Sequence, residues 1–230
     1  ACDKNQSVLE DAVLDGTITA GYLPSQTKDM LPQCDIVFVC LYPAGVAPFI
    51  LEYEPFFKSG ALITDIAGVK VKLSQDLKSF GRCDVDIILG HPMAGSEREG
   101  YTHANAEIFK GRNYIFMPLS SSKKENLTML KSLASELGFT RLIETTPEIH
   151  DHKIAFTSQL CHVIASALVE SAEDTEITAF GGGSFEDLTR IAMINAPLWT
   201  ELFIENKNEL LQHIEVFEQS LDHFKKSIIE

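Results

Sequence analysis

Short apolar runs alternate with amphipathic stretches through the first 144 residues of this 230-residue chain. The stretches at 45–57, 69–80 and 123–138 have the pattern of helices. The runs that read as strands are DIVFVCLY (35–42), ALITDI (61–66), DVDIILG (84–90), NYIFMPL (113–119) and TRLIETT (140–146). Strands separated by helices predict a parallel sheet covered on both faces, which is a doubly wound α/β domain.

The pattern changes to continuous helix near residue 146. A long helix is expected from Pro147, and GGG at 181–183 breaks it. A second helix is expected to begin with Ser184 as its N-cap. After Pro197 the chain is strongly helical, with one apolar stripe along it. We therefore expect an α/β domain over 1–145 and an all-helical domain over 146–230.

The charge and cysteine content exclude several classes of protein. Nineteen Lys and Arg against 33 Asp and Glu give a net charge of −14, which disfavours binding to nucleic acid or to an anionic membrane. No apolar run reaches the roughly 18 residues of a membrane span. Five scattered cysteines without CxxC spacing favour free thiols in a reducing compartment, and no secretory signal opens the sequence. A cytoplasmic protein is expected.

Candidate binding residues follow the expected strands. Ligands of doubly wound sheets bind at the carboxyl ends of the strands. This places Leu41, Tyr42 and Pro43, and the loop from Asp65 through Lys70 that contains Gly68, at a cofactor crevice. Loops with no ligand-binding role are the alternative for these residues.

His91 directly follows the third expected strand. A neutral imidazole there can accept a proton near pH 7, which few other side chains can do. The alternative is a structural histidine whose hydrogen bonds are satisfied within the protein.

The helical part carries two further candidates. Ser158 and His162 are four residues apart and so share a helix face, either as a core pair or as a pair that contacts substrate. Arg190 follows Asp187 by three residues, which suits a surface ion pair or a bidentate clamp on a substrate carboxylate. The histidines lack HxxxH or HExxH spacing, so no metal site is expected.

Asp3 stands where a strand ends and a helix begins. In dinucleotide-binding domains an acidic residue at the end of the second strand holds the adenosine ribose. The GxGxxG turn of such domains lies roughly 20 residues earlier, and this sequence contains no GxGxxG. A surface acid or a helix cap is the alternative for Asp3.

Four separated motifs together resemble the prephenate/arogenate dehydrogenases of tyrosine biosynthesis. They are HPMAGSE after a strand, SQLCH in a long helix, GGSFEDLTRIA, and PLW with ENK. The resemblance implies a Rossmann-type NAD-binding domain over 1–145, without its first strand and glycine-rich loop, and a helical dimerisation domain over 146–230 that forms a homodimer. It implies NAD-dependent oxidative decarboxylation of prephenate, with arogenate as the alternative substrate and tyrosine as a feedback inhibitor.

The resemblance also implies roles for individual residues. His91 matches the catalytic histidine, which accepts the proton of the substrate hydroxyl as hydride leaves. Arg190 matches the arginine that binds a substrate carboxylate, and Asp3 matches the acid that favours NAD over NADP. The other substrate positions implied are His162, Ser158, Ser96, Glu97 and Gly183.

The sequence departs from the family pattern at two places, and the second of them leaves the choice between prephenate and arogenate open. Gly68 holds the position of a loop serine that hydrogen-bonds the substrate hydroxyl in many members. Gln159 and Cys161 replace a histidine and a proline of the common helix motif, whereas Ser158 and His162 are retained.

Two other classes of protein remain as alternatives. A β-hydroxyacid dehydrogenase would place a catalytic lysine in the helical domain, but Lys153, the lysine of the candidate helix, lies a turn before Ser158. A non-catalytic ligand-sensing dimer would suit a chain without the glycine-rich loop, although such a sensor has no need of a proton acceptor at position 91.

Overall fold

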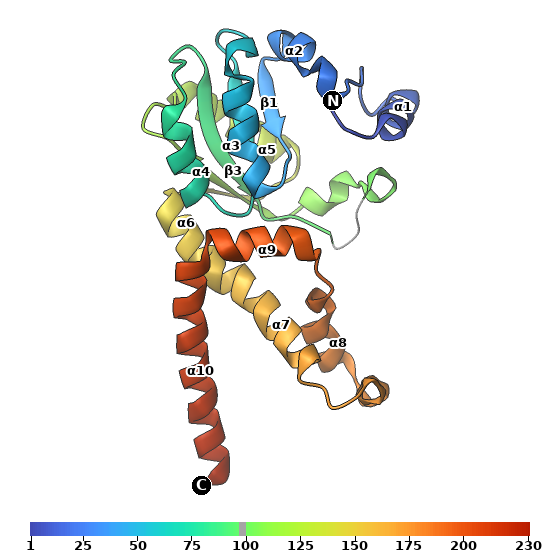
Figure 1. Cartoon of the computed structure of the whole chain (residues 1–230), viewed down its shortest axis with the longest axis vertical. Coiled ribbons are helices and arrows are strands. Elements are labelled where there is room, and N and C mark those ends of the chain that lie inside the picture. Colours follow the sequence, from blue (N-terminus) through green and yellow to red (C-terminus); the bar gives the residue numbers. More distant parts are fainter. Residues whose placement is uncertain (97–99) are drawn as a thin grey trace. The chain divides into compact units, whose positions relative to one another are not determined.

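The computed structural model describes residues 1–96 and 100–230, which divide into two compact units (Figure 1). The sheet unit comprises Ala1–Ala67 and Ser74–Thr145, and the helical unit comprises Gly68–Leu73 and Thr146–Glu230. Six residues from the first third of the chain thus belong to the same unit as the C-terminal helices.

Five strands form one sheet, in the order β1-β2-β3-β4-β5. The strand predictions are confirmed, with bounds β1 Ile36–Val39, β2 Leu62–Asp65, β3 Asp86–Pro92, β4 Asn113–Pro118 and β5 Arg141–Glu144. The helices between and before them are α1 Gln6–Leu14, α2 Thr27–Met30, α3 Pro43–Glu52, α4 Val71–Asp76 and α5 Lys124–Glu136.

The prediction of an entirely parallel sheet is wrong at β4. Strands β1, β2 and β3 run parallel, whereas β4 is antiparallel to β3 and parallel to β5. A parallel connection needs a long crossover, usually an α-helix, but the described residues between β3 and β4 form only short 3-10 turns. The chain can therefore return directly along β3.

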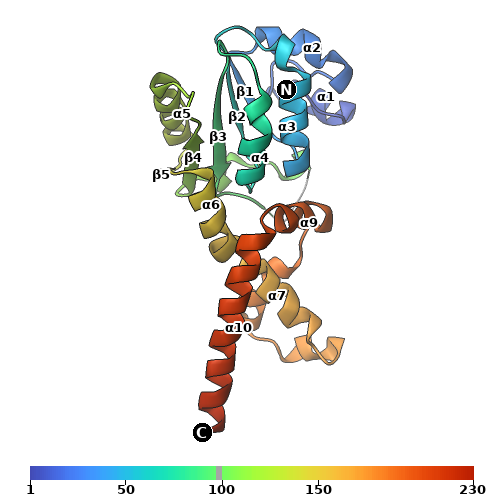
Figure 2. The ribbon, with the colours of Figure 1, turned by 60° about the vertical axis from the view of Figure 1, so that its left-hand side comes forward.

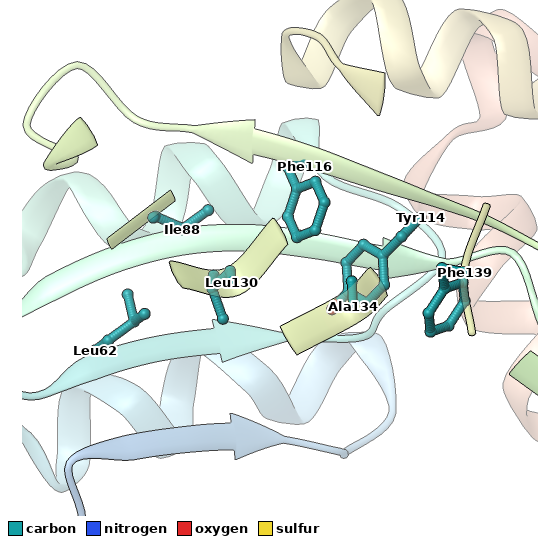
Figure 3. Close-up of a cluster of buried hydrophobic side chains, with 7 residues drawn as sticks. All are labelled: Leu62, Ile88, Tyr114, Phe116, Leu130, Ala134 and Phe139. Atoms are coloured by element: carbon teal, nitrogen blue, oxygen red, sulfur yellow. The ribbon is translucent and has the colours of Figure 1, made fainter. Parts of the chain in front are cut away.

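Helices cover both faces of the sheet. Helix α3 lies on one face and α5 on the other (Figures 1 and 2). Figure 3 shows the aromatic core beneath α5, where the rings of Tyr114 and Phe116 stack with centroids 4.4 Å apart and the Phe139 ring meets Tyr114 edge-on at 5.0 Å. The cluster consists of Leu62, Ile88, Tyr114, Phe116, Leu130, Ala134 and Phe139. This cluster holds β3 and β4 against each other, next to the position of His91 on β3.

The first residues of the chain have the geometry expected of a strand end. Cys2 forms a parallel bridge with Tyr22, and α1 then begins after Asn5, whose side chain caps the helix by accepting the Ser7 N–H at 3.1 Å. Asp3 thus lies between a strand-like segment and a helix N-terminus.

The helical unit consists of α6 to α10 and a short π-helix. The bounds are α6 Pro147–Ile154, the π-helix Ala155–Gln159, α7 Leu160–Glu170, α8 Gly183–Thr189, α9 Ala196–Glu205 and α10 Lys207–Ile229. The prediction that Ser184 caps its helix is wrong, because α8 already begins at Gly183 and Gly182 is its N-cap. Among the helices of the described residues, none is long and apolar enough to cross a membrane.

Candidate functional site

The predicted cofactor residues of the sheet unit lie at the carboxyl ends of the strands. Leu41 and Tyr42 follow β1 and are exposed, and Pro43 is the first residue of α3, where its fixed φ suits the first helical turn. Asp65 ends β2, and His91 is the penultimate residue of β3. Because β1, β2 and β3 run parallel, all of these residues lie at the same end of the sheet, where the carboxyl ends of these strands meet.

His91 lies inside β3, one residue further into regular structure than the sequence predicts. It pairs with Ile115 of β4 and is half-buried. Backbone pairing with β4 fixes where His91 lies along β3, so regular structure sets the position of its ring. Ser96 is exposed beyond the strand, and Glu97 lies outside the described residues.

Gly90, which precedes His91, is closely surrounded by other atoms. A Cβ atom at this position would lie 2.7 Å from the Tyr114 hydroxyl oxygen, 2.9 Å from the Asp65 carbonyl oxygen and 3.0 Å from Thr64 Oγ1. Only glycine lets β3 approach β2 and β4 this closely.

Replacement of Gly90 by alanine is expected to destabilise the sheet unit by about 1–3 kcal/mol, because backbone or a buried side chain must move. Urea denaturation measures the change. Gly95→Ala is the matched control, because a Cβ atom there meets nothing within 4 Å. Equal midpoints for the two variants would contradict the close packing at Gly90.

Asp65 is buried at the end of β2, with 1% of its surface exposed. Its Oδ2 accepts the Ala67 N–H at 2.9 Å and its Oδ1 accepts the Gly90 N–H at 3.2 Å. Burial, together with the negative charge of Asp65, raises the pKa of Tyr114 above its ordinary value. Asp65 therefore contacts the backbone just after β2 and near the end of β3. Its position in the sequence does not predict these contacts.

The helical unit brings His162 close to the backbone next to Arg190. His162 Nδ1 lies 2.9 Å from the carbonyl oxygen of Ile191, the residue after Arg190. A carbonyl oxygen can only accept, so Nδ1 carries the proton and donates it, and in the neutral ring Nε2 holds the lone pair. The Trp199 ring lies against His162, with centroids 3.6 Å apart. Trp199 is not among the site residues predicted from the sequence, because its proximity to SQLCH could not be inferred from spacing.

The SQLCH helix segment presents its residues in different directions. Gln159 is buried, donating from Nε2 to the Leu202 carbonyl at 2.8 Å and accepting from Asn206 Nδ2 at 2.9 Å. Cys161 is exposed, and Ser158 is half-buried within the π-helix. The Gln159 departure from the family motif thus forms part of the interior of the helical unit. Gly183 begins α8 in open space.

Gly68, the predicted loop position, belongs to the segment Gly68–Leu73 of the helical unit. Buried Asp151 of α6 holds this segment, because its carboxylate accepts the Lys70 N–H at 2.9 Å and the Val71 N–H at 2.8 Å. His150 Nδ1 lies 2.7 Å from the same carboxylate. Asp151 was not predicted as a site residue, because it lies 81 residues from Lys70 in the sequence.

The residues present fit part of a dinucleotide. Asp3 is exposed beside the start of α1, with its Oδ1 accepting the Asn5 N–H at 2.7 Å, which suits a ribose-binding acid. The exposed Leu41 and Tyr42 offer apolar surface at the sheet edge. The described residues contain no group of three or more side chains arranged to hold a metal ion.

Comparisons with known proteins cover nearly the whole chain. Residues 2–143 match the family model of the prephenate dehydrogenase nucleotide-binding domain, and residues 146–230 match that of the prephenate dehydrogenase dimerization domain. The cyclohexadienyl dehydrogenase of Zymomonas mobilis is 28% identical over 87% of this chain and 70% of that protein. The prephenate dehydrogenase of Lactococcus lactis is 31% identical over 85% of this chain, which spans about half (55%) of that enzyme.

The fold also matches a solved structure. Prephenate dehydrogenase from Aquifex aeolicus, in complex with hydroxyphenyl propionate and NAD⁺, superposes with a TM-score of 0.87, covers 99% of this chain and 80% of its own, and is 29% identical. A nucleotide-binding sheet domain followed by a helical domain defines an NAD-dependent oxidoreductase. The chain belongs to the prephenate dehydrogenase family.

Proposed function

We propose that this protein catalyses the NAD-dependent oxidative decarboxylation of prephenate to 4-hydroxyphenylpyruvate. The observation that carries the proposal lies in the helical unit, where His162 donates a hydrogen bond to the carbonyl of Ile191, the residue that follows Arg190. His91, near the carboxyl end of β3, supplies the proton acceptor that the reaction also needs. Membership of the family supports both assignments.

The proposed chemistry requires few groups from the protein. NAD, when bound, accepts the hydride from the ring carbon that bears the hydroxyl. His91 accepts the hydroxyl proton in the transition state and returns it to the phenol oxygen once the ring is aromatic. Arg190 binds a substrate carboxylate by charge-assisted hydrogen bonds, and Nε2 of His162 contacts the substrate. Loss of carbon dioxide makes the ring aromatic and drives the reaction, so the protein mainly orients the substrate.

Asp3 and the segment Leu41–Pro43 are proposed to contact NAD, the former at the adenosine ribose. Ser96, Glu97, Ser158 and Gly183 are proposed to contact the substrate, and Asp65 and Gly68 are predicted from the sequence to contact the cofactor. A carboxylate at position 3 would repel the 2′-phosphate of NADP, which supports NAD as the cofactor.

The test is formation of reduced cofactor by the full-length gene product, with prephenate or arogenate, each against NAD and NADP. Turnover of prephenate with NAD supports the proposal. Turnover of arogenate alone would mean that arogenate, and not prephenate, is the substrate. A folded protein that binds NAD but turns over neither compound points to another dehydrogenase, and one without NAD binding points to a ligand sensor. Addition of tyrosine to the same assay tests feedback inhibition.

We further propose that the helical unit forms a homodimer in the cytoplasm. The matched family model is that of a dimerization domain, and α10 exposes large apolar side chains, namely Leu211, Val216, Leu221, Phe224, Ile228 and Ile229. Five free cysteines suit a reducing compartment. Light scattering on the eluting protein should give twice the mass of the chain, and a mass of one chain at micromolar concentration would contradict the dimer.

A further inference from the structure

The buried carboxylate of Asp65 contacts two backbone segments, one just after β2 and one near the end of β3. Asp65 ends β2, and its Oδ2 accepts the Ala67 N–H at 2.9 Å and its Oδ1 accepts the Gly90 N–H at 3.2 Å. Ala67 opens the loop that leads to Gly68, and Gly90 is bonded covalently to His91. The side chain is 1% exposed, so solvent does not compete for either hydrogen bond.

The register places the Asp65 and His91 side chains on the same face. Thr64 pairs with Ile88 across the parallel strands, so Asp65 stands level with Leu89, two positions before His91. Successive side chains of a strand alternate between faces. Asp65 and His91 therefore share the face opposite to Thr64 and Gly90, on neighbouring strands.

The opposite face leaves the backbone at Gly90 little freedom. The Tyr114 hydroxyl, Thr64 Oγ1 and the Asp65 carbonyl converge on Gly90, within 3.0 Å of where a Cβ atom would lie. Tyr114 itself is fixed by its aromatic neighbours in the core (Figure 3). The peptide before His91 is thus held from one side by packing and from the other by the Asp65 carboxylate.

The negative charge of Asp65 acts on the groups around this peptide. Burial first, and then this charge, raises the pKa of Tyr114. Crowding by protein atoms and then the same charge raise the pKa of the Cys40 thiol at the end of β1, although Cys40 is partly exposed. The charge of Asp65 therefore acts on one group just after β1 and on another at the start of β4.

We propose that Asp65 is a positioning residue: its carboxylate ties the Ala67 turn to the Gly90 peptide and so sets the place of the His91 ring. This assignment rests on the proposed role of His91. The sequence prediction places Asp65 at the cofactor crevice, whereas the positioning role is argued from the two backbone N–H groups whose hydrogen bonds its carboxylate accepts. A shift of about 1 Å in a catalytic group can lower a rate about 100-fold.

The experiment compares Asp65→Asn with Asp86→Asn in the full-length protein. Asp86 is a matched control, since it is buried at the other end of β3 and its Oδ2 accepts the Lys123 N–H at 2.9 Å and Asn126 Nδ2 at 2.8 Å. Both changes keep side-chain volume and remove a buried acceptor. We expect both to lower the urea midpoint, but only Asp65→Asn to lower kcat, by about 10- to 100-fold, with KM for substrate and NAD unchanged within about twofold.

A second variant separates geometry from charge. Asp65→Glu keeps the charge but moves the oxygens by one methylene, so positioning predicts that kcat again falls. An unchanged kcat in either Asp65 variant, a change confined to the KM for NAD, or an equal loss of kcat in Asp86→Asn would overturn the proposal. So would failure of both Asp65 variants to fold while Asp86→Asn folds, because the residue would then serve the sheet alone. Absence of turnover in the unmodified enzyme would instead count against the proposed function.

Discussion

Replacement of His91 by asparagine is expected to lower kcat by about 10²- to 10⁴-fold, the usual contribution of a positioned general base. Asparagine keeps much of the ring's size and a polar end, but it cannot accept a proton near pH 7. The interaction that is lost exists only in the transition state, so KM for prephenate should change little. Initial rates of reduced cofactor formation over a range of prephenate concentrations give both constants.

The matched control for this prediction is His223→Asn on the exposed part of α10. It removes an imidazole at a position that the proposed mechanism does not use, and its kinetic constants should equal those of the unmodified enzyme. If His91→Asn retained full kcat, His91 would be a structural histidine at the strand end and the proton acceptor would have to be sought elsewhere.

Replacement of Arg190 by glutamine is expected to raise KM for prephenate by about 10- to 100-fold, which corresponds to the roughly 1.5–3 kcal/mol of a hydrogen bond to a charged group. Glutamine can donate one hydrogen bond to a carboxylate but supplies neither the positive charge nor the second parallel donor. The clamp acts in the ground state as well as in the transition state, so kcat should fall much less than kcat/KM.

Arg141→Gln serves as the control for Arg190. Arg141 is exposed at the start of β5 in the sheet unit, and its replacement changes the net charge by the same amount. An unchanged KM in Arg190→Gln, or an equal rise in Arg141→Gln, would remove Arg190 from the substrate site and leave only a general electrostatic effect.

Local patterns were sufficient to predict most of the secondary structure. The five apolar runs became β1 to β5, because their length and side-chain types favour strands, and β2 at least is buried along its whole length. The direction of β4 was predicted wrongly, since it depends on the connection from β3 and not on the residues of β4 itself. The Ser184 cap failed by two residues, because Gly182 also permits the extended backbone that an N-cap needs.

Candidate site residues could be chosen from the sequence where one residue type carries the chemistry. His91 was selected because an imidazole after a core strand is unusual, and His162 and Arg190 because their motifs resemble a family. Pairings between distant residues were not predictable from spacing. The Asp65 contact to Gly90 spans 25 positions and the His162 contact to Ile191 spans 29, so only the folded chain brings these partners within bonding distance.

The segment Gly68–Leu73 has a consequence for the order in which the chain can acquire its structure. During synthesis these residues emerge from the ribosome long before Asp151, whose buried carboxylate accepts their N–H groups. The helical unit therefore depends on contacts of high sequence separation, which form late because the intervening loop must first be closed. A fragment that began at Thr146 would bury the Asp151 carboxylate without those donors. The boundary at residue 145 therefore separates Asp151 from backbone N–H groups whose hydrogen bonds it accepts in the folded chain.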